Sequence, residues 1–300
     1  MLVFRVLGPG DEALLETFLL PRASSSMILL SNSRLVGLRD LGERFHATYA
    51  AAFQGSTLIG VVAHCWNGNS VLQAPPEHAA TLCALAVRAS TRPLTGMLGP
   101  SDQVGAALHG LGIVASALRL DSIESLFQLQ LAALRVPAGL VDGTLQARVA
   151  ARKDLDVLTA WRAAFSIEAL HAIDSADLLQ SSREAQEHSI AEGHVWLATV
   201  QGRPVATSGF NAVLSEAVQI GGVYTPPALR GRGYARAAVA QSLLEARERG
   251  VLSSLLFTGD DNPAAQRAYQ ALGYERIGDY RIVTLRSALL PANLAAGRAW

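Results

Sequence analysis

The sequence predicts an α/β protein built from two similar halves, and three observations lead to this fold class. Alternating apolar and polar residues, broken by tight turns, predict an antiparallel strand series over residues 194–224. A helical pattern follows at 235–249 and stops at Gly250. Two Pro-Pro pairs, Pro75-Pro76 and Pro226-Pro227, each end an apolar strand. Superimposing these pairs aligns the elements of the two halves, which suggests a duplication.

Length and composition support two compact domains. The chain has 300 residues, of which 50% are hydrophobic and 17% charged, so it is long enough to bury two cores. The stretch Leu134–Gly143 combines Pro, Gly and Asp between two patterned regions. We therefore expect domains at 1–140 and 141–300.

The expected elements follow one another in the same order in both halves. In the second half, apolar periodicity and turn residues predict strands at 145–150, 194–200, 204–211, 216–224, 251–258 and 277–285, with helices at 154–164, 182–192, 235–249 and 262–272. Asn262 can cap the last of these helices, with Pro263 at its first position and Gly273 at its end. In the first half, the same signals predict strands at 48–54, 57–66, 70–74 and 93–98, and helices at 77–88 and 101–111.

The segment from Val218 to Ala235 is the most informative part of the chain, because it joins an apolar strand to a helix through a loop suited to an anion. Gly231 and Gly233 let the backbone curl so that several amide N–H groups point one way. The positive end of the following helix faces the same place, and Arg230 and Arg232 add charge. This combination predicts a pyrophosphate site and hence a nucleotide-tailed cofactor.

Two motifs resemble those of the GNAT (Gcn5-related) N-acetyltransferases. Arg230-Gly231-Arg232-Gly233-Tyr234-Ala235 is similar to the (Gln/Arg)-x-x-Gly-x-(Gly/Ala) signature, and residues 262–274 are similar to the family's Asn-x-x-Ala-x-x-x-Tyr-x-x-x-Gly-(Phe/Tyr) helix. The resemblance covers about residues 145–286. It implies acetyl-CoA as co-substrate and, in each half, a twisted, mostly antiparallel sheet flanked by helices. It also implies a splay between the two strands around the loop.

The resemblance also implies roles for individual residues. Tyr269 is expected as the general acid, because a phenol of pKa near 10 is protonated at neutral pH and can protonate a thiolate. Glu216 and Glu168 are the candidates for the general base. The expected cofactor contacts are Val223, Thr225, Arg230, Gly231, Arg232, Gly233, Tyr234, Ala235, Asn262 and Tyr269, with the Val223 N–H facing the thioester oxygen. Trp161, Arg162 and Phe165 are expected to contact the acceptor amine.

The first half reads as a degenerate copy. The Pro-Pro superposition places residues 79–82, which lack glycine and arginine, where residues 230–233 stand. Aligning Gly112 with Gly273 puts Leu108 opposite Tyr269. We therefore expect residues 1–140 to support the second domain or to line its acceptor cleft.

Charge and cysteine content narrow the range of partners. The 25 basic and 25 acidic residues cancel, so neither nucleic acid nor an anionic membrane is favoured. Cys65 and Cys83 show no metal or disulfide spacing, and no His-Glu-x-x-His motif is present, so we expect no metal and a cytoplasmic location. The expected partner is a small-molecule amine, and a homodimer stays open. The alternative to an N-acetyltransferase is an acyl-CoA-binding pseudoenzyme, sensor or scaffold.

Overall fold

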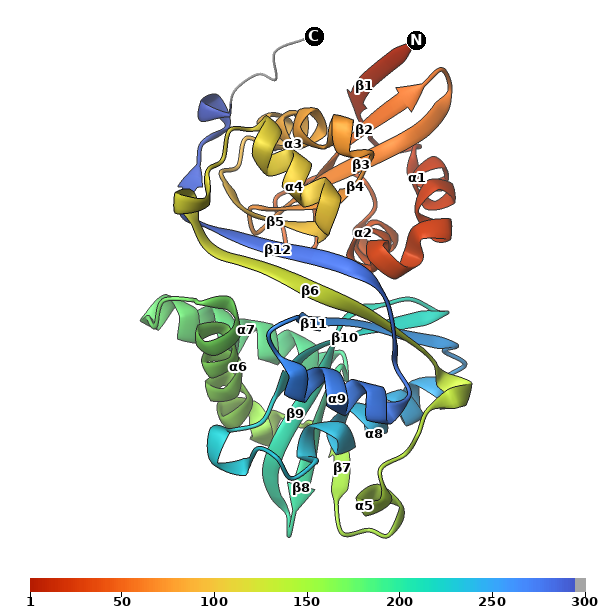
Figure 1. The fold of residues 1–300 in the computed structure, drawn as a ribbon, viewed down its shortest axis with the longest axis vertical. Coiled ribbons are helices and arrows are strands. Elements are labelled where there is room, and N and C mark those ends of the chain that lie inside the picture. Colours follow the sequence, from red (N-terminus) through yellow and green to blue (C-terminus); the bar gives the residue numbers. More distant parts are fainter. Residues whose placement is uncertain (295–300) are drawn as a thin grey trace. The chain divides into compact units, whose positions relative to one another are not determined.

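A computed structural model describes residues 1–294 (Figure 1), and these residues form two compact units. Unit 1 contains Met1–Ser125 together with the described residues from Gly278 onward, and unit 2 contains Leu126–Ile277. The predicted division near residue 140 differs from this result, because the chain passes into unit 2 at Leu126 and returns to unit 1 at Gly278. Residues 295–300, the end of the predicted second domain, lie outside the described residues.

The two sequence repeats contain strands and helices in the same order. The first comprises β1 (Leu2–Val6), α1 (Glu12–Leu19), α2 (Ala23–Val36), β2 (Ala47–Gln54), β3 (Thr57–Cys65), β4 (Asn69–Gln73), α3 (Pro76–Ser90), β5 (Leu94–Pro100), α4 (Ser101–Gly110) and β6 (Leu118–Gln130). After the short helix α5 (Ala138–Val141), the second comprises β7 (Gln146–Val149), α6 (Leu155–Leu170), α7 (Ala176–Ala191), β8 (Val195–Val200), β9 (Arg203–Val213), β10 (Ala217–Tyr224), α8 (Tyr234–Glu248), β11 (Ser253–Gly259), α9 (Pro263–Leu272) and β12 (Glu275–Leu289). This shared order supports the predicted duplication.

Each unit has a mixed sheet with one parallel pair at its centre. The strand order in unit 1 is β1-β2-β3-β4-β5-β12-β6, with β4 and β5 parallel. In unit 2 the order is β6-β11-β10-β9-β8-β7, with β10 and β11 parallel. The remaining pairs in the meanders β1-β2-β3-β4 and β7-β8-β9-β10 are antiparallel. For β8, β9 and β10 this confirms the series predicted over residues 194–224.

The repeats exchange their last strands, which the sequence analysis did not predict. Strand β12 belongs to the second repeat, yet it pairs with β5, and its Val283 and Leu285 lie in the core of unit 1. Strand β6 belongs to the first repeat, yet it is the neighbour of β11, and its Phe127 and Leu129 lie in the core of unit 2. Each unit therefore needs residues from both repeats to complete its sheet.

Helices cover both faces of the strands in unit 2. On β8, the indole of Trp196 donates a 3.0 Å hydrogen bond to Glu245 of α8, whereas the next residue, Leu197, packs with Leu158 of α6. Because successive side chains of a strand point to opposite faces, α8 and α6 lie on opposite sides of the sheet. Leu272 of α9 packs in the same core as Val239 of α8, so α9 shares the α8 side.

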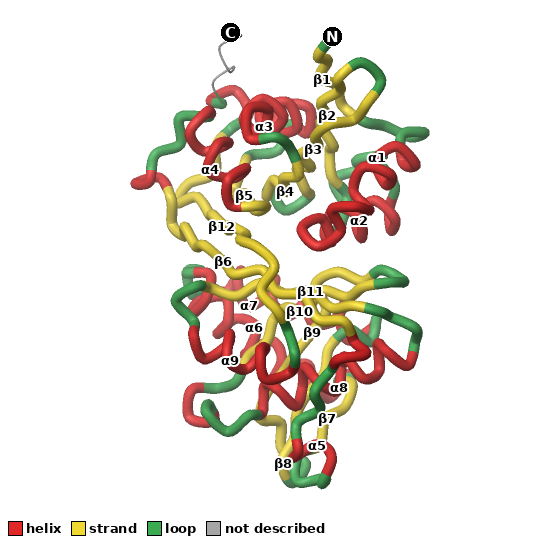
Figure 2. The backbone as a smooth tube through the Cα atoms, turned by 45° about the vertical axis from the view of Figure 1, so that its right-hand side comes forward, coloured by secondary structure: helices red, strands yellow, loops and turns green. Residues whose placement is uncertain are grey.

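Unit 1 has the same layering. Leu72 of β4 packs with Leu82 of α3, whereas the side chain of its neighbour Gln73 accepts hydrogen bonds from Ser25 and Ser26 of α2. Figure 2 shows α3 and α4 on one side of β4 and β5, and α1 and α2 on the other.

Most predicted elements are confirmed within two or three residues of their ends, although α6, α7 and β12 are longer than expected, and β1, α1, α2, α5 and β6 were not predicted. The helical run Glu12–Val36 is long and apolar enough to count as one candidate membrane span, with a mean hydropathy of 1.3. Leu15, Leu19, Leu29 and Leu30 of this run are fully buried. A core helix of a compact unit has the same properties, so the run is weak evidence for a span.

Candidate functional site

The predicted splay between β10 and β11 is present. Their parallel pairing covers Ala217–Gln219 against Ser253–Leu255 and goes no further toward the ends of the two strands. On the other side of β10, the ladder with β9 shifts register between Gly221 and Tyr224, and Gly222 has a positive φ of 60°. Gly222 and Val223 thus have no register partner. The irregularity lies where the Val223 N–H was predicted to bind the thioester oxygen.

The loop after β10 leaves a set of backbone donors unused. It contains a short 3-10 turn at Pro227–Leu229, and Gly231 and Gly233 both adopt the left-handed conformation, with φ of 77° and 80°. Within residues 1–294, no group accepts a hydrogen bond from the amides of Gly231, Arg232 or Gly233. Helix α8 begins directly after them, so its first-turn N–H groups and its positive end add to the same place. This geometry fits the predicted anion site.

The three arginines around the loop differ in what they contact. Arg230 turns back, so that its Nε donates to the carbonyl oxygen of Thr225 (2.9 Å) and its guanidinium forms a short ion pair with Glu168. The Arg232 side chain is exposed. Arg236, one turn into α8, lies over the loop, since a Cβ on Gly233 would be 3.0 Å from its guanidinium. Arg232 and Arg236 are therefore the cations immediately available to an anion.

Glu168 is held at the end of β10 by two donors. One carboxylate oxygen pairs with Arg230, and the other accepts a 2.8 Å hydrogen bond from the hydroxyl of Tyr224. The hydrogen bond from Arg230 lowers the pKa of Glu168, and the bond from Tyr224 acts in the same direction, while partial burial opposes both. Burial is the main reason why the pKa of Tyr224 is raised, with a further contribution from Glu168. A carboxylate engaged in this way is a weak base.

The second predicted base does not fit its role. Glu216 lies in the turn before β10, where its carboxylate accepts a 2.6 Å hydrogen bond from Ser215 and its carbonyl oxygen accepts from Leu252 and Ser253. Seven residues separate it from Val223, which corresponds to about 20 Å along an extended strand. This placement at the opposite end of β10 does not fit the predicted role in proton abstraction.

Tyr269 lies on α9, on the same side of the sheet as the loop helix. Its half-buried ring packs against the core of unit 2, as Val223 does, and meets Tyr274 edge to face at 5.9 Å. The predicted proton donor and the predicted thioester contact thus border one core cluster.

Asn262 and Thr225 use some of the groups expected to hold the cofactor. Asn262 caps α9 as predicted, accepting a 3.1 Å hydrogen bond from the amide of Ala265 through Oδ1, so its Nδ2 is the group left for a cofactor. The Thr225 carbonyl oxygen accepts from Arg230. Its hydroxyl is buried without a partner among the described residues.

The residues expected to contact the acceptor share helix α6 with Glu168. Trp161, Phe165 and Glu168 follow one another at helical spacing, and the Trp161 ring lies 6.3 Å from the Tyr224 ring. Arg162 lies beside them, half-buried like Trp161 and Phe165. Helix α6 contacts β10, so this face borders the Tyr224 end of the strand.

The equivalent region of the first repeat is closed. Helix α3 starts directly at Pro76, so residues 79–82 form its first turns and no glycine loop is present there. The amide of Ala74 donates a 2.8 Å hydrogen bond to the buried side chain of Gln103. At Leu72, the counterpart of Val223, strand β5 approaches so closely that a Cβ on Gly99 would be 2.9 Å from the Leu72 carbonyl oxygen.

The predicted alignment of Leu108 with Tyr269 is confirmed by matching helix ends. Ile113 donates to the carbonyl oxygen of Leu108 (2.9 Å), just as Tyr274 donates to that of Tyr269 (3.2 Å). The first repeat therefore has a leucine in place of the phenol.

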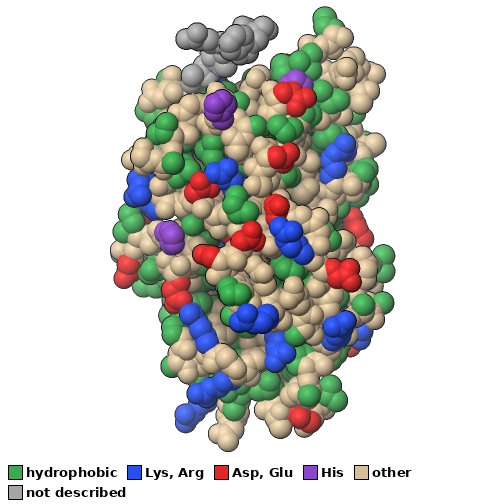
Figure 3. Space-filling view, viewed as in Figure 1, with side chains coloured by type: hydrophobic (Ala, Val, Ile, Leu, Met, Phe, Trp, Pro, Cys, Tyr) green, Lys and Arg blue, Asp and Glu red, His purple; other side chains and the backbone are tan. Residues whose placement is uncertain are grey.

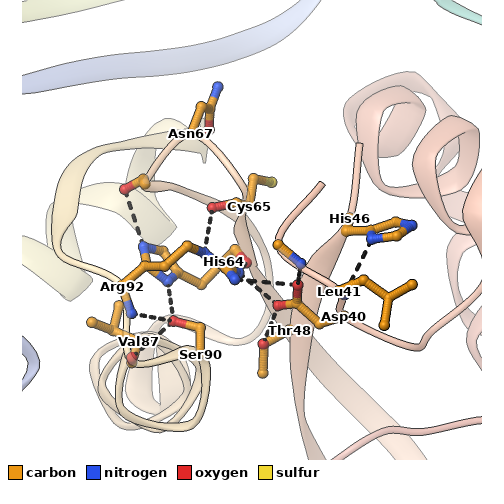
Figure 4. A network of polar contacts seen from close by, with 12 residues as sticks. Asp40, Leu41, His46, Thr48, His64, Cys65, Asn67, Val87, Ser90 and Arg92 are labelled. Atoms are coloured by element: carbon orange, nitrogen blue, oxygen red, sulfur yellow. Dashed lines mark hydrogen bonds and ion pairs between the residues drawn. The ribbon is translucent and has the colours of Figure 1, made fainter. Parts of the chain in front are cut away.

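A partly buried polar network lies in unit 1 and has a structural role (Figure 4). Arg92 bonds both carboxylate oxygens of Asp40 and the carbonyl oxygens of His64 and Cys65. His64 is fully buried, with Nδ1 2.6 Å from the Ser90 hydroxyl and Nε2 3.1 Å from the Gly68 carbonyl oxygen. Burial lowers the pKa of His64 to about 4, so the ring is neutral and both contacts are satisfied when Nε2 carries the hydrogen. The network joins the α3 end to the β2–β3 hairpin.

Basic and acidic side chains are interspersed on the face drawn in Figure 3. Residues 1–294 contain no group of three or more His, Cys, Asp or Glu side chains placed to hold a metal. Both cysteines are buried and free, and burial raises the pKa of the Cys83 thiol to about 11.

Sequence reasoning missed two residues of the site. Tyr224 was assigned only to the strand, although its place directly before Thr225-Pro226 put it at the mouth of the loop. Arg236 was overlooked although it follows Gly233 by three residues, a spacing that brings it back over the loop.

Comparison with known proteins agrees with this description. The model of the Acetyltransferase (GNAT) family matches residues 157–274. The fold is similar to that of a Drosophila protein (13% identity, 94% of this chain and 98% of that chain, TM-score 0.66). It is also similar to a GCN5-related N-acetyltransferase from Sphaerobacter thermophilus (15%, 97% and 96%, 0.57) and to a tandem GNAT protein from the clavulanic acid biosynthesis pathway (13%, 94% and 97%, 0.54). Comparison with curated proteins found no significant match.

A splayed parallel pair, a bulged strand and a glycine loop at a helix start lie within the matched residues and are compatible with acyl transfer. Residues 157–274 form a domain of the GNAT acetyltransferase family, within a chain that has the fold of tandem GNAT proteins. Members of this family transfer acyl groups to nitrogen. The first repeat has the same order of elements but lacks the loop, as expected of a degenerate copy.

Proposed function

We propose that unit 2 transfers an acetyl group from acetyl-CoA to a primary amine of a small acceptor. The observation that carries this proposal is the set of unused amides at Gly231, Arg232 and Gly233, which directly precede the first turn of α8, in the loop that follows β10. A diphosphate would match these donors, and a pantetheine arm would extend along β10 beyond the point where its pairing with β11 ends. The Arg232 and Arg236 side chains would add charge.

The residues of this site have separate tasks in the proposed reaction. Acetyl-CoA would supply an activated thioester. The amide of Val223, which lies at the bulge, would stabilise the negative charge that develops on the carbonyl oxygen, an effect that can contribute about 3 kcal/mol. The Tyr269 hydroxyl would give a proton to the departing thiolate as the C–S bond breaks and the C–N bond forms. The acceptor would lose its proton to water or to a carboxylate.

The acceptor would approach along α6, where Trp161, Arg162 and Phe165 would contact it. The neutral net charge supports a small-molecule partner, and we propose a cytoplasmic location and no metal requirement. Isothermal titration calorimetry with acetyl-CoA, followed by thiol-release assays over amines, aminoglycosides, amino acids and peptides, tests the proposal. Thiol release with one of these acceptors would support it. Tight binding without turnover on any acceptor would favour the acyl-CoA-binding pseudoenzyme.

A further inference from the structure

An ion pair connects the proposed diphosphate loop to the helix expected to contact the acceptor. Arg230, the first residue of the loop, contacts Glu168 of α6, 62 residues earlier in the chain. The same guanidinium donates to the carbonyl oxygen of Thr225 and lies 5.7 Å from the centre of the Tyr224 ring. In the free protein, the first cation of the loop is therefore paired with a carboxylate.

The ion pair between Arg230 and Glu168 can be replaced by a stronger interaction at little energetic cost. The side chains of Arg230 and Glu168 are 50% and 41% exposed, and ion pairs with such access to water contribute little net stability. A diphosphate at the loop would carry more negative charge than one carboxylate. It would also be held by the amides of Gly231, Arg232 and Gly233, so Arg230 could add to an anion that is already fixed.

We propose that Glu168 forms an ion pair with Arg230 in the free protein, and that the diphosphate of coenzyme A replaces Glu168 as the partner of Arg230 on binding. This inference rests on the proposed cofactor site. Its consequence is that Glu168 becomes available only after the cofactor has bound. Tyr224 keeps the released carboxylate in place through its hydroxyl, on the α6 face that carries Trp161 and Phe165. A protonated amine would then bind better after the cofactor than before it.

Calorimetry with coenzyme A on four proteins tests the exchange: the wild type, Glu168→Gln, Arg230→Gln and the double variant. Glutamine keeps an acceptor for the Tyr224 hydroxyl but removes the charge that competes for Arg230. We expect Glu168→Gln to tighten coenzyme A binding two- to fivefold, up to about 1 kcal/mol. Arg230→Gln should weaken binding, and adding Glu168→Gln to it should change nothing further. Asp156→Asn is the matched control, because Asp156 is on the same helix and pairs with Arg183. It should leave the affinity unchanged.

Each other result overturns the proposal. If Glu168→Gln binds coenzyme A no better than the wild type, Glu168 does not compete for Arg230. If Glu168→Gln also tightens coenzyme A binding in the Arg230→Gln background, the tighter binding comes from removing charge repulsion between Glu168 and the ligand, and not from breaking the ion pair. Failure of the wild type to bind coenzyme A would instead refute the proposed function, and the proposal with it. Thermal unfolding of each variant identifies any loss of fold.

Discussion

Replacing Gly231 by alanine tests the anion loop with a control of matching geometry. Gly231 has φ of 77°, and a Cβ added to it would meet nothing within 4 Å, so the change introduces backbone strain without a clash. Gly202, in the turn between β8 and β9 of the same unit, has φ of 75° and is equally open. A non-glycine residue in this conformation costs roughly 1–2 kcal/mol. The turn variant should therefore lose about this much stability, and the loop variant less, because the exposed loop can relax toward negative φ.

Only the loop variant should lose cofactor affinity. If Gly231→Ala relaxes toward negative φ, the amides no longer converge, and the same 1–2 kcal/mol appears in binding as a roughly 5- to 30-fold higher dissociation constant for coenzyme A. Gly202→Ala should bind as the wild type does. Urea unfolding measures the stability of both variants, and calorimetry measures their binding. Equal affinities in all three proteins would refute the assignment of the diphosphate to this loop.

Three further outcomes follow from the same structure. Tyr269→Phe should lower the rate of thiol release at least tenfold with little change in coenzyme A affinity, and an unchanged rate in stopped-flow assays would remove Tyr269 as the proton donor. Calorimetry should give one coenzyme A per chain, because the first repeat uses its Ala74 amide for Gln103, and a stoichiometry of two would contradict that closure. His64 stays neutral when folded, with a pKa of about 4, but binds a proton near pH 6.5 when unfolded. The free energy of unfolding should thus fall by about 2 kcal/mol from pH 7.5 to 5.0. His64→Gln should lose most of this slope in urea titrations, and an equal slope would show that other groups cause it.

Local signals predicted most of the elements and the loop. Strand alternation, the Asn262 cap, the C-terminal glycines and the glycine pair at 231 and 233 depend on neighbours in the chain, so a single sequence contains the necessary information. The predicted domain boundary at residue 140 differs from the boundary between the two compact units. Leu134–Gly143 does mark the connection between the two repeats, but the spatial boundary lies before it, because β6 has already entered unit 2.

Contacts between distant segments could not be predicted in the same way. Pairing of β12 with β5, and not with β11, is a choice between two edges with similar patterns, and nothing local distinguishes them. The approach of Arg230 to Glu168 depends on the length of α6, which continues to Leu170, beyond the predicted end at residue 164. The same extension places Glu168 on a regular helix, where its spacing from Trp161 sets the direction of its carboxylate.

The exchanged strand explains what the first repeat contributes to a site that it no longer contains. After β6, the chain of the first repeat passes along the end of α9, where the amide of Arg135 donates a 3.0 Å hydrogen bond to the carbonyl oxygen of Leu272. Gly273 is required there, because a Cβ on it would be 2.9 Å from the carbonyl oxygen of Ala133. Phe127 and Leu129 fill the core against which Tyr269 packs. The first repeat thus holds the helix that carries the proposed proton donor. The first repeat lacks the glycine loop that would precede α3. Its contacts with α9 come from β6 and the residues after it, which lie far along the chain from α3, so these contacts do not depend on that loop.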